Sequence, residues 1–474
     1  MGELAADEPN SITDGPFGSN LKTEHYTPTG PRVIRLQNIG DAEFVDARAH
    51  VSDAHFQTLQ KHRVFGGDIV IAALGESLPR SCLIPDLVGP AIVKADCIRF
   101  KPHREHSPKY LNLALNWEGT RKRTKTIVHG VGRPRLNLSE IKSISLPVAP
   151  PAEQRWIVAE IEKQFTRLEA GVAALRRVQA NLKRYRAAIL KAACEGRLVL
   201  TEAELARVGR GPQRGVRSNV KNAAWGHAAY NDAPFETGEA LLARILTERR
   251  QNWHGRGKYT EPAAPDTANL PEIPEGWAWS SVEQLGDVQL GHQRSPKNVS
   301  KNYPTKYMRA ANITERGIDV SDALEMEFSP AERERFSLRD GDIVLSEASG
   351  SPSQVGKPAV WREELPLCCF QNTVLRLRPA VVGSKYVLVV FQHFYANSVF
   401  AKVAGGVGIN HLGAEKFSAI PFPLPPLAEQ TRIVAEVERR LSVVEELEAV
   451  VSATLQRATR LRQSLLQTAF TGRL

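Results

Sequence analysis

The chain contains one 47-residue segment twice, and this duplication limits the folds open to it. The first copy runs from Ala152-Glu153-Gln154 to Gly196-Arg197-Leu198, and residues 428–474 repeat it without a gap, 276 residues further on. Seventeen of the 47 paired positions are identical. A period this long exceeds that of any solenoid repeat, so the sequence predicts two large, similar units in tandem.

Each copy predicts a long helix with an apolar stripe at intervals of seven. The stripe consists of Ile161, Leu168, Leu175, Leu182 and Ile189 in the first copy and of Val437, Val444, Val451, Ala458 and Leu465 in the second. Pro-Pro pairs precede both helices, and Gly196 and Gly472 follow them. This pattern is typical of a coiled coil. Two similar stripes in one chain favour an internal antiparallel pair; the alternatives are packing of each helix on its own domain, or homodimerisation.

The segments that precede the two helices share only a skeleton. Residues 35–39 (Arg-Leu-Gln-Asn-Ile) match 309–313 (Arg-Ala-Ala-Asn-Ile), and Gly-Asp-Ile-Val occurs at both 67–70 and 341–344. Gly-Val-Gly at 130–132 recurs at 406–408. Short β-rich runs, at 68–72, 91–100, 342–346 and 373–377, alternate with turns and with helical stretches such as 386–395. Each segment is therefore expected to be a mixed α/β globular domain.

The predicted organisation has five parts. These are a first globular domain (1–150), a long helix (151–198), a linker (199–270), a second globular domain (271–426) and a C-terminal long helix (427–474). Within the linker, a polar stretch from Thr201 to Asn231 is expected to lack regular structure, and a short amphipathic helix with Leu241, Leu242, Ile245 and Leu246 on one side follows it.

The charge balance suggests a polyanionic partner. Lys and Arg number 62 against 52 Asp and Glu, which gives a net charge of +10. Nucleic acid is the first candidate and a membrane surface the second. The sequence has no apolar run long enough for a transmembrane helix, and its acidic start does not resemble a signal peptide, so a cytoplasmic protein is expected. The five cysteines lack metal-ligand spacing, and reduced thiols without a zinc site are expected.

Sequence patterns for catalysis are missing. The chain has no polar-Pro-Pro-aromatic run of the kind that holds a flipped adenine, and no G-x-x-x-x-G-K-[ST] phosphate loop. Pro85-Asp86 resembles the start of a metal-nuclease signature, but Ile92 stands where the next carboxylate is required. The sequence therefore predicts no catalytic residue and no metal site.

Basic stretches in both domains point to DNA instead. The candidate DNA-binding residues are Asn20, Lys22, Arg121, Lys122, Arg123, Lys125, Arg133 and Arg135 in the first domain and Arg294, Lys297, Lys301, Lys306 and Arg309 in the second. In the second domain Asn298, Asn302, Tyr303 and Tyr307 interleave with the cations and could bond or stack with bases. A solvated basic face is the alternative interpretation.

Taken together, these motifs resemble the specificity subunit of type I restriction-modification systems. The resemblance is carried by Ala-Glu-Gln-x-x-Ile-Val-Ala-Glu at the start of both helices, which follows Pro-Pro directly in the first copy and after one residue in the second, and by Gly-Arg-Leu at their ends. The run 14–22 (Asp-Gly-Pro-Phe-Gly-Ser-Asn-Leu-Lys), Pro-Glu-Gly-Trp at 274–277, the 241–245 helix and residues 262–267 add to it. Nearly the whole chain is covered.

The resemblance implies a non-catalytic subunit. Each domain would be a target-recognition domain for one half of a bipartite double-stranded DNA site, and the paired helices would set the length of the unread spacer. Two modification subunits would bring S-adenosylmethionine for adenine N6 methylation, and restriction subunits would use ATP and Mg. A stand-alone nuclease and a protein that only recruits partners through its helices remain as alternatives.

The first domain departs from this pattern at its start. Met1-Gly2-Glu3-Leu4 stands at the point that corresponds to Leu285-Gly286-Asp287, so no counterpart of Trp277-Ala278-Trp279 precedes it. The first domain is therefore expected to be N-terminally short, through a late start codon or a missing edge strand.

Overall fold

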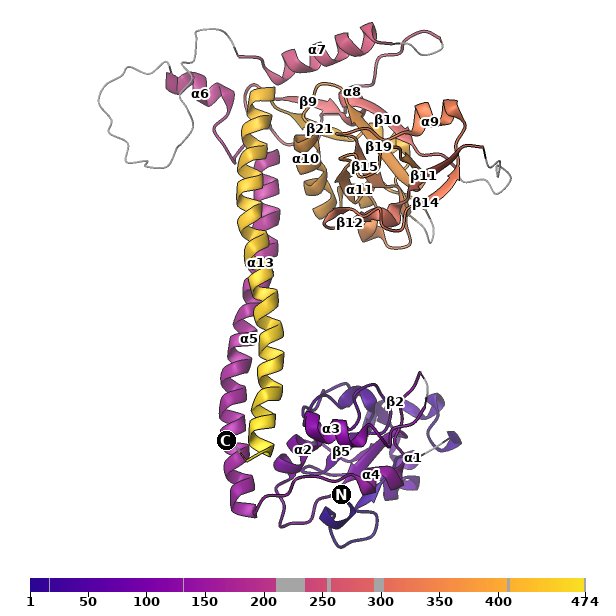
Figure 1. Ribbon diagram of the computed structural model, residues 1–474, viewed down its shortest axis with the longest axis vertical. Helices are drawn as coiled ribbons and strands as arrows, with labels where there is room; N and C mark the ends of the chain where they lie inside the picture. The colour runs from indigo at the N-terminus through magenta and orange to yellow at the C-terminus, as the bar shows by residue number, and fades with distance from the viewer. Residues whose placement is uncertain are drawn as a thin grey trace, which may run out of the picture. The chain divides into compact units, whose positions relative to one another are not determined.

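The computed structural model describes residues 1–16, 18–130, 132–209, 235–253, 257–293, 302–406 and 410–472. The chain divides into two compact units. Unit 1 comprises Met1–Val178 and Val450–Leu474, and unit 2 comprises Gln179–Ala449. Each unit combines one globular domain with part of each long helix, α5 (Pro151–Cys194) and α13 (Leu427–Phe470). The predicted mixed α/β class and internal repeat are confirmed (Figure 1).

The globular domain of unit 1 contains two four-stranded sheets, in the orders β1-β8-β5-β6 and β3-β2-β7-β4. Its strands are β1 (Ile12–Thr13), β2 (Tyr26–Ile34), β3 (His50–Val51), β4 (Arg63–Val64), β5 (Ile69–Ala72), β6 (Arg80–Leu83), β7 (Ala91–Val93) and β8 (Cys97–Phe100). Its helices are α1 (Asp53–Thr58), α2 (Pro108–Asn116), α3 (Glu118–Thr124) and α4 (Leu138–Ser143). β5 is fully buried, as its apolar sequence predicts.

Unit 2 repeats the first of these sheets as β10-β19-β15-β17. Its strands are β9 (Ala278–Ser281), β10 (Gly286–Leu290), β11 (Pro304–Met308), β12 (Ile313–Thr314), β13 (Gly317–Ile318), β14 (Leu324–Glu327), β15 (Ile343–Ser346), β16 (Ala348–Ser349), β17 (Pro358–Val360), β18 (Cys369–Phe370), β19 (Val374–Pro379), β20 (Asn410–His411) and β21 (Pro421–Leu424). Its helices besides α5 and α13 are α6 (Glu202–Gly209), α7 (Gly238–Gln251), α8 (Val282–Leu285), α9 (Pro330–Phe336), α10 (Ser384–Ala396), α11 (Val399–Val403) and α12 (Ala414–Ser418).

The shared skeleton is a repeated loop that an asparagine closes. In unit 1 the backbone N–H of Arg35 donates to Asn38 Oδ1 at 2.8 Å, and the Asn38 amide donates to two carbonyls of 45–47. In unit 2 the Arg309 backbone N–H donates to Asn312 Oδ1 at 2.9 Å, and the Asn312 amide donates to the Asp319 carbonyl and the Asp322 carboxylate. Both asparagines are buried, so their amides must be satisfied internally. The motif found in the sequence is therefore structural.

Within each unit, α5 and α13 pack antiparallel, as predicted. In unit 1 the guanidinium of Arg462 lies over the Phe165 ring and pairs with Glu169 at 3.4 Å. In unit 2 Arg186 lies 3.4 Å from both Glu445 and Glu448. Of the predicted stripe, six residues are buried and four are half-buried. The buried ones are Ile161, Leu182, Ile189, Val437, Val444 and Val451, and the half-buried ones are Leu168, Leu175, Ala458 and Leu465.

The linker differs in part from expectation. Residues 202–209 form the helix α6 rather than an irregular segment, and 210–234 lie outside the described residues. At the start of this helix Thr201 Oγ1 accepts from the Glu204 backbone N–H at 3.1 Å, and the Thr201 backbone N–H donates to the Glu204 carboxylate at 2.8 Å, which is the usual way that a threonine and a glutamate cap a helix. The amphipathic helix that the sequence predicts is α7. Within the described residues, no helix combines the length and the apolarity needed to cross a bilayer.

Candidate nucleic-acid interface

In unit 1, one end of the central sheet gathers the loops that carry several of the candidate DNA-binding residues. Ala72, the last residue of β5, pairs with the first residues of both β6 and β8, Arg80 and Cys97. β1 ends beside them, at Thr13. The segments 14–22, 73–79 and 94–96 therefore leave the sheet at the same end. We call these segments, together with the hairpin 129–135, the loop end of unit 1.

Short-range contacts hold the segments of this loop end together. The backbone N–H of Gly75 donates to Pro134 O at 3.1 Å, and Arg135 pairs with Asp96 at 2.5 Å. Gly15 lies so close to the backbone of Lys94 that a Cβ added there would stand 2.1 Å from the Lys94 carbonyl carbon. Glycine is required at position 15 because any side chain would separate these two segments.

Unit 2 builds the same loop end from different side chains. β10 ends at Leu290, β15 ends at Ser346, and β19 begins at Val374. A Cβ on Gly291 would stand 2.2 Å from Gln371 O, which repeats the close approach of Gly15. β16 pairs with β20, and His411 on β20 lies 3.1 Å from Glu347, the residue before β16. The two loop ends thus share a backbone framework and differ in their side chains.

The candidate residues of the first loop end fall into two groups. Asn20, Lys22 and Arg133 are exposed, and Lys22 Nζ lies 3.6 Å from Glu24. Arg133 has no ion pair within the described residues. Arg135, by contrast, is engaged by Asp96. The exposed members can meet phosphates directly, whereas Arg135 also orders the turn before β8.

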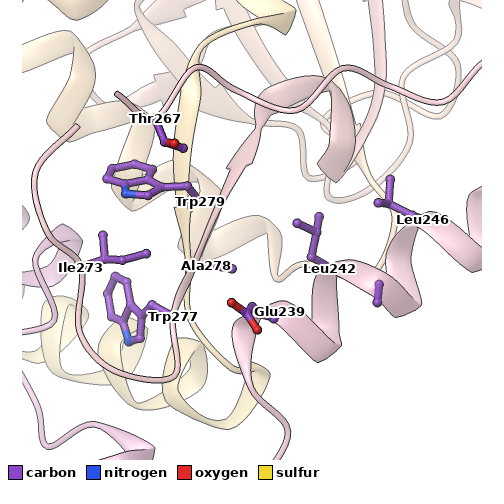
Figure 2. Close-up of a pocket in the computed structure, with 9 residues that line it drawn as sticks. Glu239, Leu242, Leu246, Thr267, Ile273, Trp277, Ala278 and Trp279 are labelled. Atoms are coloured by element: carbon purple, nitrogen blue, oxygen red, sulfur yellow. The ribbon is translucent and has the colours of Figure 1, made fainter. Parts of the chain in front are cut away.

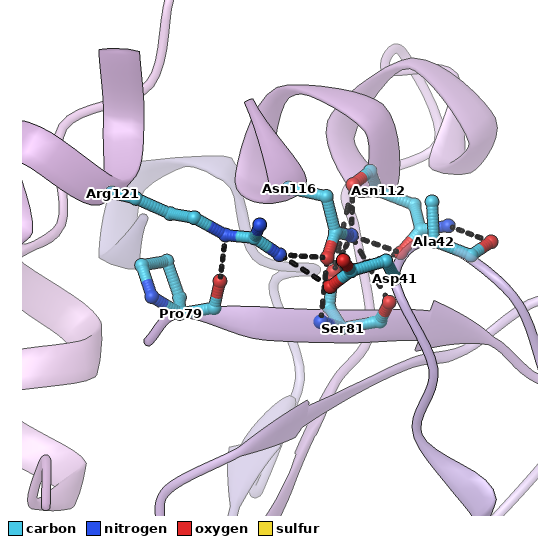
Figure 3. A network of polar contacts seen from close by, with 7 residues as sticks. All are labelled: Asp41, Ala42, Pro79, Ser81, Asn112, Asn116 and Arg121. Atoms are coloured by element: carbon cyan, nitrogen blue, oxygen red, sulfur yellow. Dashed lines mark hydrogen bonds and ion pairs between the residues drawn. The ribbon is translucent and has the colours of Figure 1, made fainter. Parts of the chain in front are cut away.

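The basic stretch on α3 divides in the same way. Arg121 is directed inward: its Nη2 donates to Asp41 Oδ1 at 2.6 Å and to Asn116 Oδ1 at 3.2 Å, and its Nε donates to Pro79 O at 3.2 Å (Figure 3). Arg123 lies over the Trp117 ring at 5.1 Å. Lys122 and Lys125 are exposed, and neither forms an ion pair in the described part of the chain. Arg121 therefore braces the 73–79 loop, and the two lysines face solvent.

The candidates of the second domain are described only in part. Lys306 is exposed on β11, opposite Glu325 on β14. Arg309 pairs with Asp322 at 2.7 Å. Arg294, Lys297, Lys301 and Asn298 lie outside the described residues. As DNA contacts, all thirteen candidates stay predictions.

Two loops of the loop ends were not predicted from the sequence. Residues 73–79 and 347–357 are neither basic nor part of a recognised motif. Both directly follow the repeated Gly-Asp-Ile-Val strand, at the same place in each copy. The feature of the sequence that could have identified these loops is their position directly after the shared strand.

Metal-ligating groups, thiols and one pocket are further features of the described residues. No group of three metal-ligating side chains occurs among the described residues. The five cysteines are buried and unpaired, and burial raises the pKa of Cys82 to about 12, so its thiol stays protonated at neutral pH. A pocket of about 560 Å³ lies between α7 and the segment that leads into β9. Figure 2 shows Trp277, Trp279, Ile273 and Leu242 around it together with Thr267 and Glu239, and a lining with a carboxylate and without a cation does not suit a phosphate.

The glutamate of the duplicated Ala-Glu-Gln motif lies in a different environment in each copy. Glu429 is buried, and it accepts hydrogen bonds from Trp277 Nε1 at 2.9 Å and from the Glu202 backbone N–H at 3.1 Å. Burial raises the pKa of Glu429 despite these donors. Glu153, its counterpart, is exposed. Identity in sequence does not give these two glutamates the same role.

Comparison with known proteins gives a consistent picture. No protein-family model matches the chain. The chain is 30% identical over 214 residues to the type I restriction enzyme StySPI specificity subunit of Salmonella potsdam, a match that covers 44% of this chain and 45% of that protein. The EcoKI specificity subunit of Escherichia coli strain K12 is 29% identical over 214 residues, which cover 43% of this chain and 44% of the relative. The matches thus span a little under half of these relatives.

A solved structure supports the same assignment at the level of the fold. It was reported in connection with complex assembly and conformational transition of the type I R-M system, and it superposes with a TM-score of 0.65 at 17% identity. The superposition covers 100% of this chain and 97% of that one. The chain is thus similar to type I restriction-enzyme specificity subunits in sequence over a little under half of its length, and it shares its fold with a solved chain from a type I R-M system.

Proposed function

We propose that this chain is the DNA-reading, non-catalytic subunit of a type I restriction-modification complex in the cytoplasm. Each loop end binds one half of a bipartite double-stranded DNA site. The helix pair sets the unread spacer and docks two modification subunits, which bring S-adenosylmethionine; restriction subunits bring ATP and Mg. The observation that carries the proposal is the pair of loop ends, built on one framework with different exposed side chains.

The electrostatics of the first loop end suit this role. Lys22, Arg133, Lys122 and Lys125 are exposed in or beside it, and cations of this kind release counterions when they neutralise phosphates. Phosphate contacts position a protein on the duplex, while polar side chains such as Asn20 can bond base edges. Because the side chains differ between the loop ends, the two half-sites should differ as well.

Co-expression with the neighbouring methyltransferase, followed by sequencing of modified bases, tests the function. The expected methylated target has two unequal half-sites separated by a fixed stretch of unread bases. Omitting this chain from the co-expression is the control, and it should leave the DNA unmodified at that target. Identical half-sites would contradict the inference from the loop ends. Methylation or cleavage by the purified chain alone would favour an enzyme over a specificity subunit.

A further inference from the structure

The glutamine of the duplicated Ala-Glu-Gln motif occupies equivalent positions in both units. Gln154 and Gln430 lie in the first turns of α5 and α13, and both are almost fully buried. A buried primary amide must satisfy its oxygen and its NH₂ group within the protein. The partners of each amide therefore show what the motif holds together.

In unit 1 the Gln154 side chain joins three segments. Its Oε1 accepts from the backbone N–H of Ser107 at 2.8 Å, and its Nε2 donates to Ala149 O at 2.7 Å. Ser107 is the N-cap of α2, the principal helix of the domain, and Ala149 directly precedes the Pro-Pro pair. One amide thus connects the long helix, the chain that enters it and the start of a domain helix.

Unit 2 repeats each of these contacts with every residue number raised by 276. Gln430 Oε1 accepts from the backbone N–H of Gly383 at 3.1 Å, and Nε2 donates to Pro425 O at 2.9 Å. Gly383 is the N-cap of α10. Ser107 and Gly383 differ as residues, yet both supply a backbone N–H. We call each of these arrangements an amide clamp.

The clamp lies where each domain joins its long helix, and other contacts, such as the packing of Tyr110 and Trp117 against Phe470 in unit 1, surround this junction. The segments that enter the long helices, 145–150 and 425–426, contain no helix or strand, so they do not themselves fix an angle between domain and helix. The planar amide has an acceptor and a donor on opposite sides, and each is bonded to backbone from a different segment. Rotation of the domain about the start of its helix would break at least one of these bonds.

We propose that Gln154 and Gln430 are positioning residues that hold each domain at a set angle on its long helix, and that they thereby narrow the range of spacer lengths the subunit accepts. The second part of this inference rests on the proposed function. The first part concerns the protein alone and can be tested without DNA.

Spin-label distance measurements on the full chain test the angle directly in unit 2. Labels are attached at Lys402→Cys on α11 and Glu446→Cys on α13, which are both exposed, whereas the native thiols are buried. Gln430→Met keeps the volume of the side chain but removes both hydrogen bonds. We expect the distance distribution between the labels to become about two-fold wider, because the joint then samples more than one angle.

Two further variants separate positioning from general loosening. Val390→Ala removes a buried methyl pair from α10 without touching the clamp, and it should leave the distribution at wild-type width. Gln430→Glu retains an acceptor for Gly383 but places a second oxygen against Pro425 O, so an intermediate width is expected; it carries the test if Gln430→Met does not fold. A folded Gln430→Met protein of wild-type width, or equal widening by Val390→Ala, overturns the proposal.

Binding to duplexes of graded spacer length tests the second part, once the target has been mapped. Gln430→Met should bind spacers one base pair too short or too long almost as well as the native spacer, with unchanged affinity for a duplex that carries one half-site. If the variant keeps wild-type spacer selectivity, the link to the spacer is wrong. If the unmodified chain has no spacer preference, the proposed function fails, while the distance result still decides the clamp.

Discussion

Inserting one heptad into each long helix should lengthen the spacer of the DNA target by about three base pairs. Seven helical residues add about 10 Å to a helix, and the duplex rises about 3.4 Å per base pair. The insertions belong within 176–190 of α5 and within 441–455 of α13, since Arg186 faces Glu445 and Glu448 there. Both half-sites should stay as they are, because no residue of either loop end changes.

The same insertion also changes the angle at which the second half-site is presented. Three base pairs rotate the duplex by about 100°, whereas a heptad turns a helix face by only about 20°. The DNA must twist or bend to compensate, so we expect affinity for the new spacer to be about tenfold lower than for the native complex. Selection from a DNA library with spacers of graded length measures both effects.

A variant of equal length provides the control for the insertion. Exposed residues of the same helical stretch, such as Arg184 and Gln456, are replaced by alanine, which should leave the preferred spacer unchanged. An inserted chain that still selects the native spacer would show that the helix pair does not measure the distance between half-sites.

Replacing Arg121 by methionine is expected to lower the stability of unit 1 by about 3 kcal/mol. Hydrogen bonds from a charged donor contribute roughly 1.5–3 kcal/mol each, and the variant loses those to Asp41, Asn116 and Pro79 together. Chemical unfolding of the full chain, with hydrogen exchange of residues 108–124 as the local readout, measures this loss.

Lys122→Met on the same helix is the matched comparison. Its side chain faces solvent, so stability should stay within about 0.5 kcal/mol of the wild type. If this lysine contacts a phosphate, the slope of log affinity against log salt falls by about 0.9 in magnitude. Equal destabilisation by both variants would contradict the division of α3 into a bracing and a solvent-facing part. An unchanged salt slope for Lys122→Met would remove this face of α3 from the interface.

Local patterns predicted the repeated features well. The apolar stripe identifies the helix pair because the buried positions of a coiled coil recur every seven residues along the sequence. Every residue of the stripe is at least half-buried. The repeated Gly-Asp-Ile-Val strand marks the central sheet of both domains for a similar reason: buried strands are apolar runs bounded by turns.

Features that depend on distant partners could not be predicted in this way. Arg121 looked like part of a basic run, but Asp41, 80 residues earlier, engages it in the folded chain. Glu153 and Glu429 stand in identical motifs, yet only Glu429 is covered by Trp277 and Glu202. The 73–79 loop became a candidate only when the sheet register placed its ends beside β8 and β1. Sequence neighbours do not reveal such partners.

The amide clamp has a consequence for how such a protein can change over generations. What the clamp requires from each domain is one main-chain N–H at the start of a helix and one carbonyl at the entry to the long helix, and nearly any residue supplies these. Substitutions on the outer surface of either domain therefore leave the clamp intact, whereas an exchanged domain must also match the apolar contacts that Tyr110 and Trp117 make with Phe470. On the proposed function, new target sequences would then arise by change within the domains while both long helices and both clamps are retained.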